Sequence, residues 1–338
     1  MKRLLAAALC CLVLLTGCTT EPQKKQYTAT FLDVFDTVTT ITGRAESEEA
    51  FETAVNAIHE DLTRYHQLFD IYSDYHGLAN LKTVNDAAGK EAVTVSSDII
   101  TLLEDCKGYY ELTGGMVNVA MGSVLSLWHD ARENSTNDPQ HPYLPEESAL
   151  TAAAAHTDIA NIRIDRENST VFLADAEMRL DVGAVAKGWA AQKVAEKAPA
   201  GLLISVGGNV CATGPKDEQG TPWVVGVNDP DGGDYLHTLY IKTGCVVTSG
   251  DYQRYFVVNG KRYHHIIHPE TLQPSEGFRS VTIVCPDSGL ADALSTALFL
   301  LPYEDGKALA ERSGAQAMWV TADGKMLYTD GFSQLVRT

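Results

Sequence analysis

Residues 291–301 read ADALSTALFLL, an apolar run interrupted by one carboxylate and two hydroxyls. This pattern predicts a helix that packs into the core, and it anchors our interpretation of the fold. Asp292 and Thr296 stand four positions apart, so they lie on the same side of that helix. Such side chains either cap the first turn of a helix or act as hard oxygen ligands. The choice depends on the rest of the chain.

The segments around this stretch mix helices and strands without strict alternation. Helices are predicted over 48–69, from Ser96 or Ser97 to Gly114, near 147–156, from about Ala184 to Lys197, and over 289–301 and 303–313. Strands are predicted at 31–43, 161–165, 170–174 and 178–182, in short segments between 201 and 285, and at 315–321 and 325–329. Residues 130–146 read as a polar loop. Bunched strands favour an α+β fold over a doubly wound parallel sheet, and no Pro/Gly/Ser-rich break divides residues 31–338 into two domains.

The N-terminus has the pattern of an export signal. Lys2 and Arg3 precede an apolar run that is shorter than the roughly 20 residues needed to span a bilayer. Leu15-Thr16-Gly17-Cys18 resembles the bacterial lipobox, which implies removal of residues 1–17 and lipidation of Cys18. Residues 18–30 then read as a flexible tether. The expected location is the extracytoplasmic face of a bacterial membrane, with a lipid anchor.

The charge and the cysteines restrict the possible partners. The formal net charge of −18 repels phosphate backbones, so nucleic acid is not an expected partner. Any anionic ligand must be held by local charge, a helix N-terminus or a bound cation. Cys106, Cys211, Cys245 and Cys285 contain no C-x-x-C pair, which gives a zinc or redox site little support. They are disulfide partners or, as we favour, buried free thiols.

Residues 179–192, RLDVGAVAKGWAAQ, predict a strand that passes through Asp181 and Gly183 into a helix. A helix N-terminus carries unpaired N–H groups and partial positive charge, so it suits a diphosphate. Lys187 adds a full charge one turn later. The alternative is a packing contact between small residues. Residues 205–214, SVGGNVCATG, predict a turn after an apolar strand.

Three histidines, His264, His265 and His268, stand close together in residues 246–274. In a continuous strand, His264 and His268 share one face about 13 Å apart, and His265 faces the other side. A shared metal therefore requires the strand to break near Pro269. A single histidine here is suited to general-base chemistry, and surface or core histidines are the alternative.

The motifs, taken together, resemble a known family. FDTVTTI, FDIYSDYHGLANL, TGGMVNVAMGSVLSLW, DVGAVAKGWAAQ, SVGGN, TSGDYQRYF, HHIIHPET and ADALSTALFLL occur in the order seen in ApbE-type FAD:protein FMN transferases, from about residue 31 to 330. The resemblance implies a T-fold-like α+β domain with mixed or antiparallel sheets flanked by helices. It also implies bound FAD as substrate, Mg²⁺, and transfer of FMN to a Ser or Thr of an extracytoplasmic acceptor protein with release of AMP.

The same resemblance implies roles for individual residues. The expected FAD contacts are Phe35, Tyr72, Met116, Val117, Asn118, Asp181, Lys187 and Ile267. The expected metal ligands are the carbonyl of Ala184 and the side chains of Asp292 and Thr296, and His265 is the expected catalytic residue. The resemblance thus favours ligation over capping at residues 292 and 296. Capping then falls to Asp287 or Ser288, earlier in the chain.

Two positions depart from the family pattern. His268 replaces the usual Asp of H-x-I-D-P, and Val117-Asn118 replaces Phe-Asp. Neither change removes an expected metal ligand. Two other functions fit the same residues: an FAD diphosphatase that yields FMN and AMP, and a flavin-binding lipoprotein without catalysis.

Overall fold

An eight-stranded sheet forms the centre of the molecule in a computed structural model, of which residues 24–337 are described. Its strand order is β1-β2-β6-β7-β10-β13-β14-β15, and all the neighbouring strands are antiparallel. These strands are β1 (Lys25–Val34), β2 (Thr37–Ala45), β6 (Leu202–Val206), β7 (Asn209–Ala212), β10 (Gly244–Gly250), β13 (Phe278–Cys285), β14 (Gln316–Thr321) and β15 (Met326–Tyr328).

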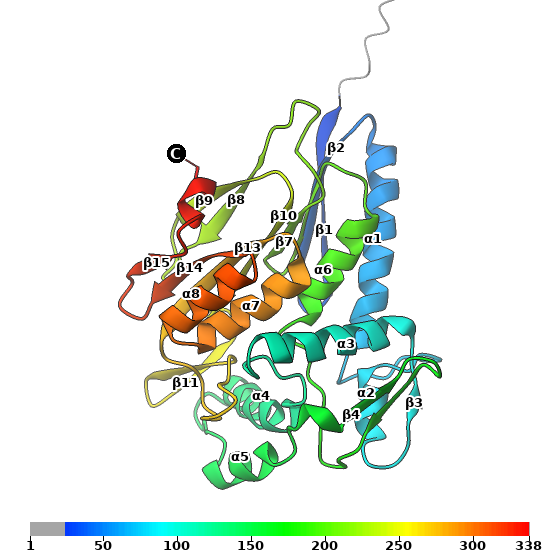
Figure 1. Ribbon diagram of the computed structural model, residues 1–338, viewed down its shortest axis with the longest axis vertical. Coiled ribbons are helices and arrows are strands. Elements are labelled where there is room, and N and C mark those ends of the chain that lie inside the picture. Colours follow the sequence, from blue (N-terminus) through cyan, green and yellow to red (C-terminus); the bar gives the residue numbers. More distant parts are fainter. Residues whose placement is uncertain (1–23, 338) are drawn as a thin grey trace, which may run out of the picture.

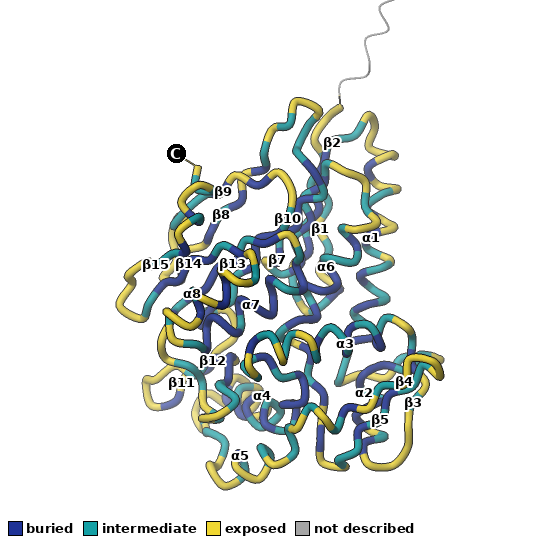
Figure 2. The backbone as a smooth tube through the Cα atoms, viewed as in Figure 1, coloured by how far each residue is buried: buried dark blue, intermediate teal, exposed yellow. Residues whose placement is uncertain are grey.

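Four helices cover one face of this sheet (Figure 1). They are α1 (Glu48–Phe69), α6 (Ala186–Lys197), α7 (Ser288–Leu300) and α8 (Tyr303–Arg312). Figure 2 shows that α7 is buried along most of its length. Leu294, Ala297 and Leu298 have no exposed surface, since α7 packs on the sheet and also against its neighbours α6 and α8. The stretch quoted first is therefore the central helix of the helical layer.

The opposite face of the sheet is covered by a second small sheet. This sheet consists of β8 (Trp223–Asn228) and β9 (Tyr235–Ile241), and the short helix η2 (Phe332–Leu335) packs against β9 and β14. A separate apolar cluster fills the space between them and the large sheet. The molecule thus has three layers: helices, the large sheet and the β8–β9 hairpin.

The remaining elements lie below the helical layer in Figure 1. They are α2 (Leu81–Asp86), α3 (Ser97–Leu112), α4 (Gly122–Asn137), α5 (Glu147–Ala154), η1 (Ile159–Asn161), the β3-β5-β4 sheet (Val93–Thr94, Thr170–Leu173 and Ile162–Asp165) and the β11–β12 hairpin (Tyr255–Val258 and Lys261–His264). A third apolar cluster joins α4 and α5 to the β11–β12 hairpin.

The α+β class with antiparallel sheets and flanking helices is confirmed. The helices expected over 48–69, 289–301 and 303–313 are present to within a residue or so, and Ser96 caps α3. Asp287 caps α7 by accepting the Leu290 N–H, which leaves Asp292 and Thr296 free for another role. Cys106, Cys211, Cys245 and Cys285 are buried thiols.

Four expectations about local structure are wrong. Residues 25–30 of the expected tether belong to β1, which pairs with β2 along its length. The single strand expected at 31–43 is a hairpin, because Phe35 and Asp36 adopt positive φ values of 55° and 51°. Residues 130–137 continue α4, and residues 178–182 form only an isolated bridge at Arg179. Tertiary contacts prevail over polar composition at 130–137, where buried Ala131 and Ser135 face the core.

The expected signal of residues 1–17 and the lipidated Cys18 lie outside the described residues. Among residues 24–337, no helix has both the length and the hydropathy required to cross a bilayer.

The buried position of α7 leads to a stability prediction. Leu298→Ala removes a fully buried side chain and leaves a cavity under the helix, so we expect a loss of about 2–5 kcal/mol in the free energy of unfolding. Leu32→Ala is the matched control, because Leu32 is 72% exposed. Urea denaturation measures both. Equal losses for the two variants would contradict the core assignment.

Candidate active site

Helices α6 and α7 cross so closely that only glycine fits at residue 188. A Cβ atom there would lie 2.4 Å from both the Asp292 Cβ and the Ser288 carbonyl oxygen. Because the backbones approach this far, the Gly188 N–H donates a 2.8 Å hydrogen bond to Asp292 Oδ2. Asp292 is 5% exposed and comes from the second turn of α7.

This contact frees a backbone carbonyl at the start of α6. In an α-helix, the N–H of residue 188 would bond to the carbonyl of Ala184. Here the N–H bonds to Asp292, and no other donor reaches the Ala184 carbonyl within the described residues. The sequence predicted that the helix begins at about Ala184, but it begins at Ala186, with Val185 outside it at φ −139°. The Ala184 oxygen therefore remains available.

Two side-chain oxygens on α7 are available as well. Asp292 Oδ2 accepts from Gly188 and, at 3.0 Å, from Asn209 Nδ2, whereas Oδ1 has no hydrogen-bond partner in the described part of the chain. A helical threonine often bonds the carbonyl four residues earlier. For Thr296 that carbonyl belongs to Asp292, where the hydroxyl of Ser295 is the side-chain donor, and the Thr296 hydroxyl has no hydrogen-bond partner within residues 24–337.

The three expected metal ligands thus each offer an unused oxygen. A carboxylate, a hydroxyl and a carbonyl are the donors that Mg²⁺ prefers. No cluster of three or more His, Cys, Asp or Glu side chains suitable for a metal occurs in the described residues. A cation at this place would depend on one carboxylate, neutral oxygens and oxygens from the ligand or water.

The charge of Asp292 is only partly compensated. Burial raises the pKa of Asp292, and Lys187 together with the bonds from Gly188 and Asn209 opposes that rise without reversing it. Lys187 makes no ion pair with Asp292 and donates to the Gly183 carbonyl at 3.4 Å. Since a buried carboxylate is costly without a charged partner, the site favours a nearby cation.

His265 is oriented as a base. Its Nδ1 lies 3.2 Å from the Arg254 carbonyl oxygen, which can only accept, so Nδ1 carries the proton and Nε2 keeps its lone pair. His265 is an exposed residue, but nearby protein atoms desolvate its ring. These surroundings, with the cations Arg254 and Lys187, hold the pKa of His265 below its usual value. The imidazole is therefore neutral near pH 7, as a general base requires.

The other two histidines have structural bonds. The strand ends at His264, whose Nε2 donates to the Ser275 carbonyl at 2.6 Å and whose Nδ1 accepts the Ile266 N–H. His268 Nδ1 accepts the Glu270 N–H at 3.2 Å. An aspartate would form the same turn bond, so His268 preserves the local backbone of H-x-I-D-P.

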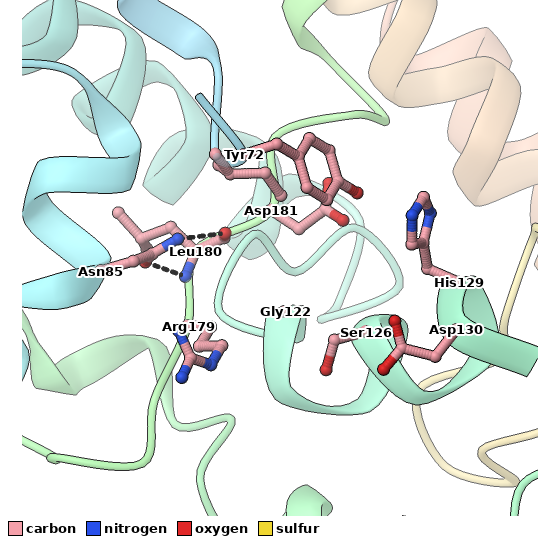
Figure 3. Close-up of a pocket in the computed structure, with 10 residues that line it drawn as sticks. Tyr72, Asn85, Gly122, Ser126, His129, Asp130, Arg179, Leu180 and Asp181 are labelled. Carbon is pink, nitrogen blue, oxygen red and sulfur yellow. Dashed lines mark hydrogen bonds between the residues drawn. The ribbon is translucent and has the colours of Figure 1, made fainter. Parts of the chain in front are cut away.

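A pocket of about 220 Å³ lies at the segment that leads into α6 (Figure 3). It is lined by Ile71, Tyr72, Asn85, Gly122, Ser126, His129, Asp130, Arg179, Leu180 and Asp181. Tyr72 follows α1, is 61% exposed and stacks on His129 of α4 with ring centroids 5.1 Å apart. Asn85 exchanges two hydrogen bonds with the backbone of Leu180, drawn as dashed lines in Figure 3. The segment that carries Asp181 is thereby fixed.

Electrostatic interactions join the pocket to the α6–α7 crossing. Desolvation and the Asp181 charge raise the pKa of Tyr72 to about 12, while Arg132 and Arg254 oppose the rise. Arg254 also acts on His265, and Lys187 acts on both His265 and Asp292. The chain itself links the two places, because Asp181 lines the pocket and Gly188, seven residues later, donates to Asp292.

The remaining expected FAD contacts come from three distant segments and differ in accessibility. Phe35 is half-buried, with its N–H donating to His66, and Met116 packs against the main core. The Val117 and Ile267 side chains are 2% and 6% exposed. Asn118 donates to the Thr157 carbonyl and accepts the Ala120 N–H, both at 2.9 Å. The geometry therefore gives Val117, Asn118 and Ile267 packing or hydrogen-bonding partners within the protein.

Sequence analysis missed several residues of this site. Asn85 and His129 lie outside the quoted motifs, and Arg179 opens the stretch 179–192 but received no role, because only tertiary contacts bring these side chains to the pocket. Asn209 was interpreted as part of a turn. Its position directly after two glycines was the available signal, because such a turn holds the next residue in a fixed direction.

Spare hard oxygens, a neutral histidine and an adjoining pocket are together typical of enzymes that act on phosphate esters. Comparison with known proteins makes the class specific. The ApbE family matches residues 35–319, and the chain belongs to that family.

Relatives match most of the chain, some by sequence and some by structure. A FAD:protein FMN transferase of Treponema pallidum is 34% identical over 301 residues, 83% of this chain and 81% of that protein. One from Klebsiella pneumoniae is 31% identical over 282 residues, 80% of this chain and 83% of that protein. The crystal structure of the ApbE protein of Thermotoga maritima has a TM-score of 0.83 at 30% identity, covering 93% of this chain and 100% of that one. The flavinyl transferase ApbE of Pseudomonas stutzeri shows the same fold, with a TM-score of 0.76 at 24% identity over 93% of this chain and 97% of that one.

The close helix crossing predicts that alanine substitutions at two glycines change the free energy of unfolding in opposite directions. Gly188→Ala pushes α6 away from α7, and we expect a loss of about 1–3 kcal/mol in the free energy of unfolding. Gly108→Ala is the control within α3, where a Cβ meets nothing within 4 Å, and we expect a gain of about 0.5–1 kcal/mol. Chemical denaturation measures both. A neutral Gly188→Ala variant would show that the two helices separate easily.

The surroundings of His265 lead to a titration prediction. The folded protein disfavours the charged ring, so the pKa of His265 lies below its usual value of about 6.5. The ring is therefore neutral at pH 6.5 and above. Arg254→Gln removes one of the opposing cations, so the titration should move to higher pH. The Cε1–H signal in NMR follows both proteins. Titration of wild-type His265 at or above the usual pH, or no upward movement in the variant, would contradict this account.

Proposed function

We propose that this protein is a Mg²⁺-dependent FAD:protein FMN transferase that attaches FMN through a phosphoester bond to a Ser or Thr of an acceptor protein. The observation that carries the proposal is the set of three unused oxygens on Ala184, Asp292 and Thr296, together with a neutral His265. The chain belongs to the ApbE family, and its relatives named FAD:protein FMN transferase support this proposal.

These residues would hold Mg²⁺ against the diphosphate of FAD. The bound metal would neutralise charge on the phosphate oxygens, including the charge that builds up on the leaving AMP. Lys187 supplies a further positive charge close to Asp292. The remaining coordination positions suit phosphate oxygens and water.

His265 supplies the proton acceptor. The Ser or Thr hydroxyl oxygen of the acceptor protein forms a bond to the FMN phosphorus, and the bond from that phosphorus to the AMP oxygen breaks. The hydroxyl proton passes to Nε2 of His265. AMP leaves as a phosphate monoester. Since the Nδ1 proton is held by the Arg254 carbonyl, Nε2 is the only ring nitrogen with a lone pair for this step.

The pocket beside Tyr72 is suited to a ring of FAD. Tyr72 and His129 offer stacked, partly open aromatic faces, and Asp181 offers a carboxylate acceptor at the wall. Aromatic faces of this kind stack on planar heterocycles. We propose Tyr72 and Asp181 as contacts to FAD on this basis.

We further propose that the protein is attached to the extracytoplasmic face of a bacterial membrane through Cys18. The described residues begin at Lys24 and β1 starts at Lys25, at the opposite end of that strand from α4 and α5 (Figure 1). The 22 residues of α1 run from that end towards Tyr72 and span roughly 33 Å at 1.5 Å per residue. An anchor at the N-terminus would therefore leave the pocket facing away from the membrane, towards an acceptor such as a redox subunit.

The test is transfer of a fluorescent flavin. The protein is incubated with FAD, Mg²⁺ and an acceptor protein that carries a Ser or Thr flavinylation motif, and we expect an acceptor band whose flavin fluorescence survives denaturation. Free FMN and AMP without a labelled band would instead establish a diphosphatase. Bound but intact FAD would establish a flavin-binding protein, and either result overturns the proposal.

Asp292→Ala tests the ligand assignment. Because it removes the only carboxylate of the proposed metal site, we expect labelling to fall by at least a hundredfold at any Mg²⁺ concentration. Asp287→Ala is the matched control on the same helix, since it removes the cap and costs about 0.5–2 kcal/mol of stability without removing a ligand. Wild-type labelling by the Asp292 variant would defeat the assignment.

A further inference from the structure

The Gly-Gly-Asn turn makes a contact that its sequence did not reveal. Gly207 and Gly208 join β6 to β7 with φ values of 58° and 92°, as two-residue hairpin turns of type I′ require. Asn209, the first residue of β7, is 2% exposed and donates from Nδ2 to Asp292 Oδ2 at 3.0 Å. The residue therefore faces α7 across the helix–sheet interface.

Oδ2 of Asp292 has two protein donors and Oδ1 has none within residues 24–337. Gly188 donates to Oδ2 from α6, and Asn209 donates to the same oxygen from the sheet. With donors on two sides of Oδ2, the carboxylate cannot rotate about its Cβ–Cγ bond without losing hydrogen bonds in a buried place. The free oxygen, Oδ1, is held in one direction.

We propose that Asn209 is a positioning residue that acts through Asp292 and turns Oδ1 towards the cation. The inference rests on the metal site of the proposed function. Partners that orient a metal ligand without touching the metal commonly contribute 10–100-fold to metal affinity. Gly188 cannot replace Asn209, because one hydrogen bond leaves the plane of the carboxylate free to turn.

The side chain is suited to this role in a way that other residues are not. An amide donor is neutral, so it orients the carboxylate without competing with the cation for its charge. A lysine at residue 209 would form an ion pair that neutralises Asp292, and an aspartate would add a repelling charge and no donor. Asn209 therefore fixes the ligand and leaves its charge for the metal.

The experiment uses Mn²⁺ as the probe, with the free ion followed by EPR. Asn209→Leu keeps the approximate shape of the side chain but has no donor, and we expect its dissociation constant for Mn²⁺ to rise 10–100-fold. Asn80→Leu is the matched control, because Asn80 is also fully buried and hydrogen-bonded but caps α2. It should lose stability while its Mn²⁺ affinity stays within twofold of wild type.

A second readout separates positioning from general damage. In the labelling assay, the Mg²⁺ concentration for half-maximal rate should rise in Asn209→Leu, while the KM for FAD at saturating Mg²⁺ changes little. If Asn209→Leu does not fold, Asn209→Ser takes its place, since its hydroxyl is too short to reach Oδ2 from the same backbone.

The outcomes distinguish the two proposals. Wild-type protein that binds Mn²⁺, with an Asn209 variant that binds it equally well, overturns the positioning role alone. Wild-type protein that shows no Mn²⁺ binding, with or without FAD, overturns the metal site and the positioning role together.

Discussion

The bond from the Gly188 N–H to the Asp292 carboxylate is the constraint on which the rest of the site depends. It joins residues 104 positions apart and is possible only because residue 188 has no side chain between the two helices. One donor is thereby withdrawn from the first turn of α6, which frees the Ala184 carbonyl and fixes one oxygen of Asp292. A packing contact between two helices thus leaves the Ala184 carbonyl without a partner and holds Asp292 Oδ2.

Several cations lie around the site although the protein as a whole is acidic. The whole chain has a formal net charge of −18 and would repel an anionic nucleotide. Around the pocket, however, Arg132, Arg254 and Lys187 lie close enough to perturb Tyr72 and His265. These cations, with the metal proposed at Asp292, are the groups that would attract a diphosphate, because partly buried charges are weakly screened at short range.

The two departures from the family pattern preserve local structure. His268 supplies through Nδ1 the turn acceptor that an aspartate would supply. Asn118 uses both halves of its amide, donating to Thr157 and accepting from Ala120, whereas an ionised aspartate could only accept. Both substitutions therefore keep the backbone near the site in place, and neither touches Ala184, Asp292, Thr296 or His265.

The sequence by itself determined the α+β class, the core helix over 291–301 and the shared face of Asp292 and Thr296, because periodicity and four-residue spacing are local properties. The family motifs also singled out His265 and Lys187. The tertiary structure alone decided that Asn209 meets Asp292, that Asn85 holds Leu180 and that residues 130–137 are helical. These features arise when segments distant in the chain bury surface and satisfy hydrogen bonds against one another, and no local pattern encodes such a pairing.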